Sequence, residues 1–389
     1  QIRSMVPSIF DGMRPFEPEE LPNAYAELLA DSAFQKVVGY AFPNIPFEGV
    51  AATMLGCKTN LEFQLAFCQP FLENIINRCS DGLTSDLSAI ALTPEKQNYT
   101  FITNHRDIVL DSGFLDLLMV RNGLSTVEIA IGDNLLIYPW IKTLVRINRS
   151  FIVTRSGGIH DILHASKKLS GYIHYAINEK RSTIWIAQRE GRSKDSMDET
   201  QESLLKMFAI EGEGSLKERL RSINLVPMAI SYEYDPCDWL KAQEFQQKRD
   251  IKDFHKSQAD DLMNMKTGIF GKKGRIHYQA APCINSFLDT IPDDVTKQEL
   301  FTMVAHHIDK GIYANYQLFP GNYVALDLLE GNEANAHRYS AEEKAVFESY
   351  LNEQLAKIQL ENKDEAFLRH KMLEMYANPA RHQLQVIAE

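Results

Sequence analysis

Short apolar runs alternate with longer segments of helical periodicity through the middle of the chain. Five runs rich in Ile, Val, Phe and Tyr have the composition of buried strands: residues 99–104, 126–131, 150–154, 183–187 and 225–232. Helix-like stretches lie between them, notably 114–120 and 159–180. Strands that alternate with helices in this way form a largely parallel sheet covered by helices. The pattern therefore predicts an α/β fold for the centre of the chain.

Both flanks are predicted to be helical. Residues 61–76 carry apolar side chains three and four positions apart, including Phe63, Phe67 and Phe71, which predicts a buried helix face. Further helices are predicted beyond Pro236, over 239–253, 257–267, 297–316 and 341–357. We therefore expect three parts: an N-terminal helical domain (1–96), an α/β domain (97–285) and a C-terminal helical extension (286–389).

The composition is that of an ordinary globular protein and argues against two classes. The 389 residues are 44% hydrophobic and 24% charged. No run reaches the roughly 18 apolar residues of a transmembrane helix, and no signal peptide is expected. The formal net charge of −11 argues against broad nucleic-acid binding, which needs a basic face. A few clustered arginines can still bind a local anionic ligand.

The cysteines bear on the cellular compartment. There are five, an odd number, and none forms a Cys-x-x-Cys pair. This indicates free thiols in a reducing compartment rather than a disulfide framework or a zinc site. We therefore expect a cytoplasmic protein without a bound metal.

A candidate general base follows the first predicted strand. Asn104-His105-Arg106-Asp107 comes directly after it, with Asp111 just beyond, where the strand ends of an α/β protein open onto a crevice. A neutral His105 there can take a proton from a hydroxyl while a carboxylate fixes its tautomer. Alternatively, His105 is a plain loop residue and Asp107 is the N-cap of the next helix. His-Arg-Asp also occurs in protein kinases. However, Ser112 stands where a kinase needs Asn, and the other kinase motifs do not occur in the required order along the chain.

Two later stretches place cations at strand ends. Phe151-Ile152-Val153-Thr154-Arg155 ends a strand with an arginine, whose planar fork suits phosphate recognition. Gln188-Arg189-Glu190-Gly191-Arg192-Ser193-Lys194 follows another strand, and its glycine permits close backbone approach to a ligand. The alternatives are a solvated arginine and a surface turn. A fourth stretch, Val226-Pro227-Met228-Ala229-Ile230, is an apolar strand that can be core or pocket wall.

Together and in this order, these stretches resemble the glycerolipid acyltransferase family, which includes glycerol-3-phosphate and lysophosphatidate acyltransferases. The family has a His and an Asp separated by four residues, a Phe-Ile-x-Arg-like block, a Glu-Gly-x-Arg/Ser block and a Pro-containing apolar strand. The resemblance covers roughly residues 98–235 and depends more on order and spacing than on any one motif. Residues 271–277 are similar to the short basic strand that leads to the end of the family's catalytic domain.

The resemblance implies direct acyl transfer without a covalent enzyme intermediate or a cofactor. His105 would deprotonate a hydroxyl of glycerol 3-phosphate or its 1-acyl derivative, and this oxygen would attack the thioester of acyl-CoA or acyl-carrier protein. Backbone amides near Gly191 would stabilise the oxyanion. The implied substrate-binding residues are Arg155, Arg192 and Lys194 for the phosphate, Glu190 for a glycerol hydroxyl, and Gly191 and Ser193 in the same block.

One departure from the family pattern concerns the carboxylate. Five residues separate His105 from Asp111, instead of four. His105 must then lie before the helix, with Asp111 reaching back from its first turn, and the extra residue would rotate Asp111 by about a quarter turn unless the loop absorbs it. Asp107 could take the orienting role instead, so both carboxylates stay candidates.

Other functions stay open. The acceptor could be another lipid hydroxyl, such as that of a lyso-aminolipid. Water could replace the alcohol, which would make the protein an acyl thioesterase. A non-catalytic lipid- or acyl-carrier-binding protein would not need His105 at all.

A membrane contact is also predicted. Residues 135–141 are apolar and aromatic and are followed by Lys142, Arg146 and Arg149. This combination favours a peripheral contact on the inner face of the membrane, which would give an acyl chain a route from the bilayer. The alternative is a core helix with basic ends.

Overall fold

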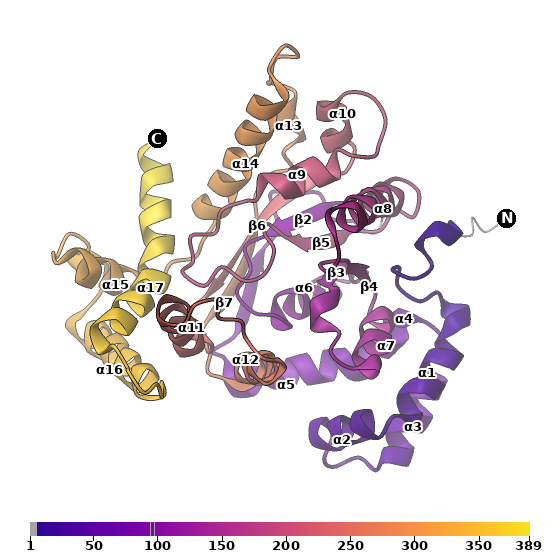
Figure 1. Ribbon diagram of the computed structural model, residues 1–389, viewed down its shortest axis with the longest axis horizontal. Helices are drawn as coiled ribbons and strands as arrows, with labels where there is room; N and C mark the ends of the chain where they lie inside the picture. The colour runs from indigo at the N-terminus through magenta and orange to yellow at the C-terminus, as the bar shows by residue number, and fades with distance from the viewer. Residues whose placement is uncertain (1–5, 94, 97) are drawn as a thin grey trace.

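The computed structural model describes residues 6–93, 95–96 and 98–389. Its centre is a seven-stranded sheet with the order β1-β7-β6-β2-β5-β3-β4 (Figure 1). The strands are β1 Leu83–Asp86, β2 Thr100–Thr103, β3 Glu128–Gly132, β4 Ser150–Val153, β5 Ile184–Ala187, β6 Leu225–Tyr232 and β7 Ile276–Ala280. Strands β2 to β6 are parallel, whereas β7 runs antiparallel to β6, and β1 is parallel to β7. The predicted α/β class is confirmed.

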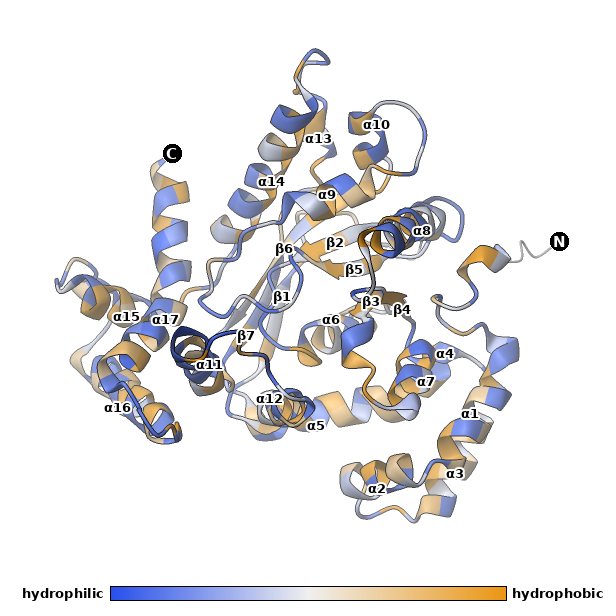
Figure 2. Cartoon of the chain, in the orientation of Figure 1, coloured by the Kyte–Doolittle hydropathy of each residue, from blue (hydrophilic) through white to orange (hydrophobic). Residues whose placement is uncertain are grey.

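Each central strand is buried on both faces, which explains why its sequence is a continuous apolar run. All residues of β2, β4 and β6 are buried, and β2 and β5 are orange in Figure 2. Neighbouring side chains of a strand point to opposite faces. Accordingly, Phe101 and Ile102 of β2 belong to two different hydrophobic clusters.

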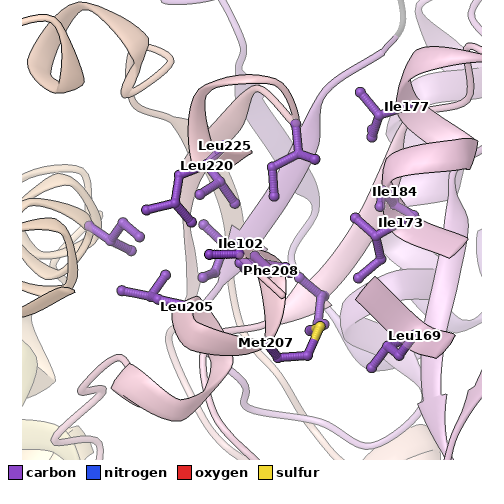
Figure 3. Close-up of a cluster of buried hydrophobic side chains, with 14 of the residues drawn as sticks. Ile102, Leu169, Ile173, Ile177, Ile184, Leu205, Met207, Phe208, Leu220 and Leu225 are labelled. Carbon is purple, nitrogen blue, oxygen red and sulfur yellow. The ribbon is translucent and has the colours of Figure 1, made fainter. Parts of the chain in front are cut away.

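One face of the sheet is covered by helices that lie above it in Figure 1. They are α8 Ile159–Asn178, α9 Glu202–Phe208, α10 Leu216–Arg221, α13 Asn285–Leu288 and α14 Lys297–Ala314. Figure 3 shows the strand residues Ile102, Ile184 and Leu225 among side chains of these helices. This hydrophobic cluster fixes α8 and α9 against the sheet and so positions one side of the site described below.

The opposite face is covered mainly by α5 Gln69–Cys79 and α6 Leu110–Arg121. Helix α6 contributes Phe114 and Leu118 to a cluster that also contains Trp185 and Val226 from the sheet. Helix α12 Gln258–Phe270 packs beside α5. The start of α6 is therefore anchored by a full hydrophobic core.

The N-terminal helices form a separate cluster together with a helix of the central region. They are α1 Leu21–Ala30, α2 Ser32–Ala41, α3 Phe47–Gly56 and α4 Asn60–Phe63, and they pack on α7 Pro139–Ile147. A π-helical turn over Gln64–Cys68 joins α4 to α5. The side chain of Gln64 in this turn bonds to Asn148 and Thr126. The predicted buried helix over 61–76 is thus found, with one wide turn.

The C-terminal helices surround their own hydrophobic cluster. They are α11 Asp238–Asp250, α15 Pro320–Glu330, α16 Ala341–Ala356 and α17 Glu365–Ala388. Short 3₁₀ turns cover Ser8–Phe10, Pro18–Glu20, Asp133–Leu135 and Ala336–Arg338. The three-part division drawn from the sequence stays a prediction. The sheet and its covering helices extend past 97–285, since β1 lies before residue 97 and α14 follows residue 285.

Candidate active site

A cleft of about 650 Å³ opens at the carboxyl ends of β2, β3, β4 and β5. This size is typical of small-molecule sites, and the position is where open α/β sheets bind ligands. The cleft is lined by several of the residues singled out in the sequence: His105, Arg155, Glu190, Gly191, Arg192 and Lys194. They come from the segments that follow β2, β4 and β5, so the sheet brings these distant stretches together.

His105 is held at the end of β2. The side chain of the preceding Asn104 bonds both to the carbonyl of Ile230 (2.9 Å) and to its amide (2.8 Å). This pair extends the β2–β6 ladder by one residue and fixes where the strand ends. The imidazole lies edge-on to the Trp185 ring, with centroids 5.7 Å apart, and the side chain is 11% exposed. His105 therefore has a defined orientation on the wall of the cleft.

Asp111 lies directly behind the imidazole. Its Oδ2 is 2.7 Å from His105 Nδ1 and also accepts the backbone N–H groups of Arg106 (2.6 Å) and Asp107 (3.1 Å). Its Oδ1 accepts the hydroxyl of Tyr232 at 3.2 Å. A buried carboxylate with these donors favours the tautomer with the proton on Nδ1. Nε2 is then the basic nitrogen.

Asp107 has a different place. Its Oδ1 accepts the backbone N–H groups of Val109 (3.0 Å) and Leu110 (2.8 Å), as a helix N-cap does. Burial raises the pKa of Asp107, and the charge of Asp111 adds to this effect. Its carboxylate also touches α12, because a Cβ at Gly268 would overlap Asp107 Oδ2. The structure thus pairs His105 with Asp111 and uses Asp107 at the start of α6.

The extra residue between His105 and Asp111 is taken up by the loop. Residues 104–107 are not helical, and α6 begins only at Leu110. Asp111 is consequently in the first turn and reaches back to the imidazole. This resolves the spacing problem without any distortion of the helix.

A buried ion pair fixes this loop to the one that follows β5. Arg106 Nη1 and Nη2 each lie 2.5 Å from a carboxylate oxygen of Asp198. Tyr316 donates its hydroxyl to the same carboxylate. Lys241 donates to the carbonyl of Arg106 at 3.0 Å. Burial alone would raise the pKa of Asp198, but the charge and hydrogen bonds of Arg106 more than offset this and hold it below its ordinary range.

The segment after β5 forms a turn along the cleft. Gly191 adopts a positive φ of 71°, a conformation that favours glycine. The amide of Glu190 donates to the Gln201 side chain at 2.8 Å. The Glu190 carboxylate lies 3.5 Å from Arg155, and both side chains are partly exposed. Arg155 and Glu190 are therefore neighbours on one rim of the cleft.

Arg192 is buried at the opposite wall. Its Nη2 donates to Asn264 Oδ1 of α12 at 2.9 Å, while Nη1 is buried without a hydrogen-bond partner among the described residues. Buried polar groups are almost always paired, so an anion in the cleft would complete this guanidinium. One buried nitrogen of Arg192 is thus available to donate a hydrogen bond to an anion.

Two lysines extend this positive region. Lys194 lies 3.3 Å from Glu244, and Lys256, which the sequence did not single out, lies 4.0 Å from the same carboxylate. Both lysines line the cleft. Burial lowers the pKa of Lys194 to about 8, although Glu244 opposes the shift. Ser193, by contrast, is turned into the loop, where its hydroxyl contacts Asp195 and the Asp198 amide.

Much of the remaining lining of the cleft is apolar. Aliphatic and thioether side chains come from β3, α7, α8, α9 and α12, including Ile131, Ile141, Ile162, Leu169, Met207 and Met265. The cleft therefore combines cations on its rim and at one wall with a large apolar surface, in which polar side chains such as Asn134, Ser166 and Gln201 are interspersed. Such a lining suits an amphipathic molecule with an anionic head.

The segment predicted to contact a membrane, residues 135–141, is partly buried and partly exposed, with Tyr138 41% exposed. Leu135 and Ile141 line the cleft, and Trp140 packs on Phe34. Arg146 donates to the carbonyls of Arg14 and Asp11. The cation that follows, Arg149, donates to Thr126. Arg146 and Arg149 are thus used within the fold, whereas Tyr138 and Lys142 are exposed, and the membrane contact of this segment stays a prediction.

Three contributors were missed from the sequence: Asp198, Tyr316 and Lys256. Asp198 bonds to Arg106, 92 positions away, and to Tyr316, 118 positions away, and no local pattern marks such contacts. Lys256 belongs to a polar segment before α12 that has no motif of its own.

Comparisons with known proteins identify no family. Neither models of protein families nor curated protein sequences match the chain. Among solved structures, it is similar to the crystal structure of the 1-acyl-sn-glycerophosphate (LPA) acyltransferase PlsC from Thermotoga maritima. The TM-score is 0.35 and the sequence identity 10%, over 76% of this chain and 95% of that chain. The function is therefore inferred from the site itself.

Two further observations concern metals and membranes. Within the described residues, no group of three or more His, Cys, Asp or Glu side chains is arranged to hold a metal ion. In the same part of the chain, every helix falls short of the length or apolar content needed to cross a bilayer. The expected lack of a metal and of a cofactor stays a prediction.

Proposed function

We propose that the protein is an O-acyltransferase. It transfers a fatty acyl group from acyl-CoA or acyl-carrier protein to a hydroxyl of glycerol 3-phosphate or 1-acylglycerol 3-phosphate. The observation that carries the proposal is the 2.7 Å contact between His105 Nδ1 and Asp111, with the imidazole on the wall of a cleft that contains both a group of cations and a large apolar surface. A general base, an anion site and an apolar groove are the three features that this reaction needs.

The chemistry of the proposed reaction begins at His105. Nδ1–H is directed to Asp111, and Nε2 accepts the proton of the acceptor hydroxyl as its oxygen attacks the thioester carbonyl. The tetrahedral intermediate then collapses, the C–S bond breaks, and the imidazolium returns its proton to the leaving thiolate. Asp111 stabilises the imidazolium in between, and its backbone donors keep it fixed.

The positions of the cations indicate which part of the cleft would hold the acceptor's phosphate and which the acyl chain. Arg155, Arg192 and Lys194 would hold the acceptor's phosphate, with Glu190 near enough to Arg155 to bond a glycerol hydroxyl. Arg192 is the strongest candidate for binding the phosphate, because one of its buried nitrogens lacks a hydrogen-bond partner among the described residues. The apolar walls would take the acyl chain. The five free cysteines favour a reducing, cytoplasmic compartment.

The test is an acyl-transfer assay that pairs both donors with several acceptors: glycerol 3-phosphate, 1-acylglycerol 3-phosphate, a lyso-aminolipid and none. We expect acylation of a phosphate-bearing acceptor, lost in His105→Ala and retained in His337→Ala, which changes an exposed histidine of the C-terminal region. Thioester consumption that no acceptor alters would instead indicate a thioesterase. Equal activity of wild type and His105→Ala would contradict the proposal.

A further inference from the structure

An exposed aliphatic cluster, which we call the α8 rim, lies in the first two turns of α8. It consists of Ile159, Ile162 and Leu163, which are 82%, 40% and 60% exposed. Residues three and four apart share one face of a helix, so the three side chains are neighbours. Isolated exposed aliphatics are common, but a contiguous group beside a ligand cleft marks an interaction site.

The α8 rim is continuous with the candidate active site. Ile162 lines the cleft, as do Ala165, Ser166 and Leu169 further along the helix. Successive residues advance by about 100° around a helix. On that geometry Ile159 and Leu163 lie next to the cleft-facing side. An apolar molecule bound to the rim would therefore be at the entrance of the apolar groove.

The other flank of the α8 rim is basic. His160, His164 and Lys167 follow Ile159 and Leu163 around the helix and are exposed. The Lys167 ammonium lies 3.9 Å from Glu211, and its side chain is 69% exposed. Arg155, on the rim of the cleft, precedes the helix. Apolar side chains beside the positive charges of Lys167 and Arg155 are complementary to a lipid surface with anionic headgroups.

A lipid surface fits this region better than a second protein does. A stable protein interface buries about 800 Å² on each partner, which three side chains on the end of one helix do not supply. Insertion of a few aliphatic side chains is enough for reversible contact with a bilayer. We propose that the α8 rim docks the protein on an anionic lipid surface, so that a lipid substrate can pass along α8 into the cleft. The route into the cleft rests on the proposed function, whereas the docking itself does not.

Flotation with vesicles tests the docking. The full chain is mixed with phosphatidylcholine vesicles that contain phosphatidylglycerol, and with phosphatidylcholine alone. We expect the wild type to float with the anionic vesicles, and the partition coefficient of Ile159→Ser/Leu163→Ser to fall by about tenfold or more, because each lost side chain removes an apolar group from the bilayer. The matched control is Ile387→Ser, at a 71% exposed position near the end of α17.

The results separate the docking from the chemistry. Acyl transfer to a water-soluble acceptor from a short-chain thioester should be unchanged in Ile159→Ser/Leu163→Ser, which also controls for folding. Flotation without acyl transfer in any assay would leave the docking intact and reject the proposed function. A wild type that does not float would overturn the docking, as would equal partitioning of the rim variant and the Ile387→Ser control. A dimer in solution that the rim variant disperses would also overturn it.

Discussion

At the scale of single residues, Asp107 and Asp111 have different contacts, and the sequence alone did not show which of them lies against His105. The Asp111 carboxylate contacts the imidazole and accepts hydrogen bonds from two backbone amides, whereas the Asp107 carboxylate accepts the Leu110 amide at the start of α6. The sequence predicted His105 and both carboxylates, because motif order and residue type are local properties. It could not rank them, because the ranking depends on where the helix begins.

The two carboxylates should respond differently to the same substitution. Asp111→Asn removes the charge that stabilises the imidazolium and changes the partner of Nδ1, so we expect kcat/KM to fall by about 10²–10⁴-fold. Asp107→Asn should cost less than about tenfold, since Asn is as good an N-cap as Asp. Steady-state kinetics with the best acceptor from the assay measures both. A larger loss in Asp107→Asn than in Asp111→Asn would reverse the assignment.

Lys194 should give the reaction a limit at alkaline pH. Its pKa of about 8 means that the ammonium loses its proton as pH rises through that value, and its attraction for a phosphate is lost with it. We expect kcat/KM for a phosphate-bearing acceptor to fall by about threefold to tenfold between about pH 7 and about pH 9. Lys194→Arg should remove this decline, because a guanidinium stays charged throughout. A decline of the same size in Lys194→Arg would exclude Lys194 as its source.

At the scale of elements, the loops after β2 and β5 act as one unit because Arg106 and Asp198 join them. The guanidinium is 8% exposed and the carboxylate is fully buried, so neither charge has bulk solvent as a substitute partner. Removing one member of such a pair leaves the other buried and unpaired, which is costly. The loops that carry His105 and Arg192 would then no longer be joined by this ion pair.

Asp198→Ala should therefore lower the free energy of unfolding by about 3–5 kcal/mol. Urea denaturation measures the change. The control is Asp289→Ala, whose partner Arg221 is half exposed, and which should lower the free energy of unfolding far less, because solvent screens an exposed pair. Similar losses of unfolding free energy in both variants would show that the buried pair stabilises the fold no more than the exposed pair does.

Elements with strong apolar patterns were predicted well, and those without them were not. The five parallel strands are continuous apolar runs because helices cover both faces, so composition alone marks them. Strand β1, Leu-Thr-Ser-Asp, has one buried residue at its start and exposes two others, so its sequence looks like a loop. Strand β7 was indicated only through the family resemblance, and its antiparallel direction depends on a connection that no pattern encodes.

At the scale of the whole molecule, stability should depend on pH through carboxyl groups buried behind the sheet and helices. Burial raises the pKa of Asp116 and of Asp309 to about 7 and that of Asp238 to about 6. The folded protein then keeps protons that the unfolded chain releases above its ordinary pKa of about 4. These groups therefore reduce stability as pH rises from about 4 to about 7. Burial lowers the pKa of His174 and His382, which are buried, and of His307, which is half-buried, and these groups act in the opposite direction.

A single variant isolates one of these groups. Asp116→Asn keeps the acceptor for the Val127 amide, now 2.8 Å from Oδ1, but cannot ionise. Relative to wild type, we expect this variant to become more stable as pH rises from about 5 to about 7, by at most about 1.4 kcal/mol per pH unit. Asp294→Asn, at an exposed position, should show no such trend. Unfolding curves in urea at each pH measure the difference, and parallel curves for Asp116→Asn and wild type would refute it.

The missing side chain at Gly268 has a mechanical consequence. Helix α12 rests so closely on the Asp107 carboxylate that even one added carbon would collide with it. A larger residue at position 268 would press on this carboxylate and disturb its bonds to the amides of Val109 and Leu110. Helix α12 can therefore approach the start of α6 this closely only because it has no side chain at this position.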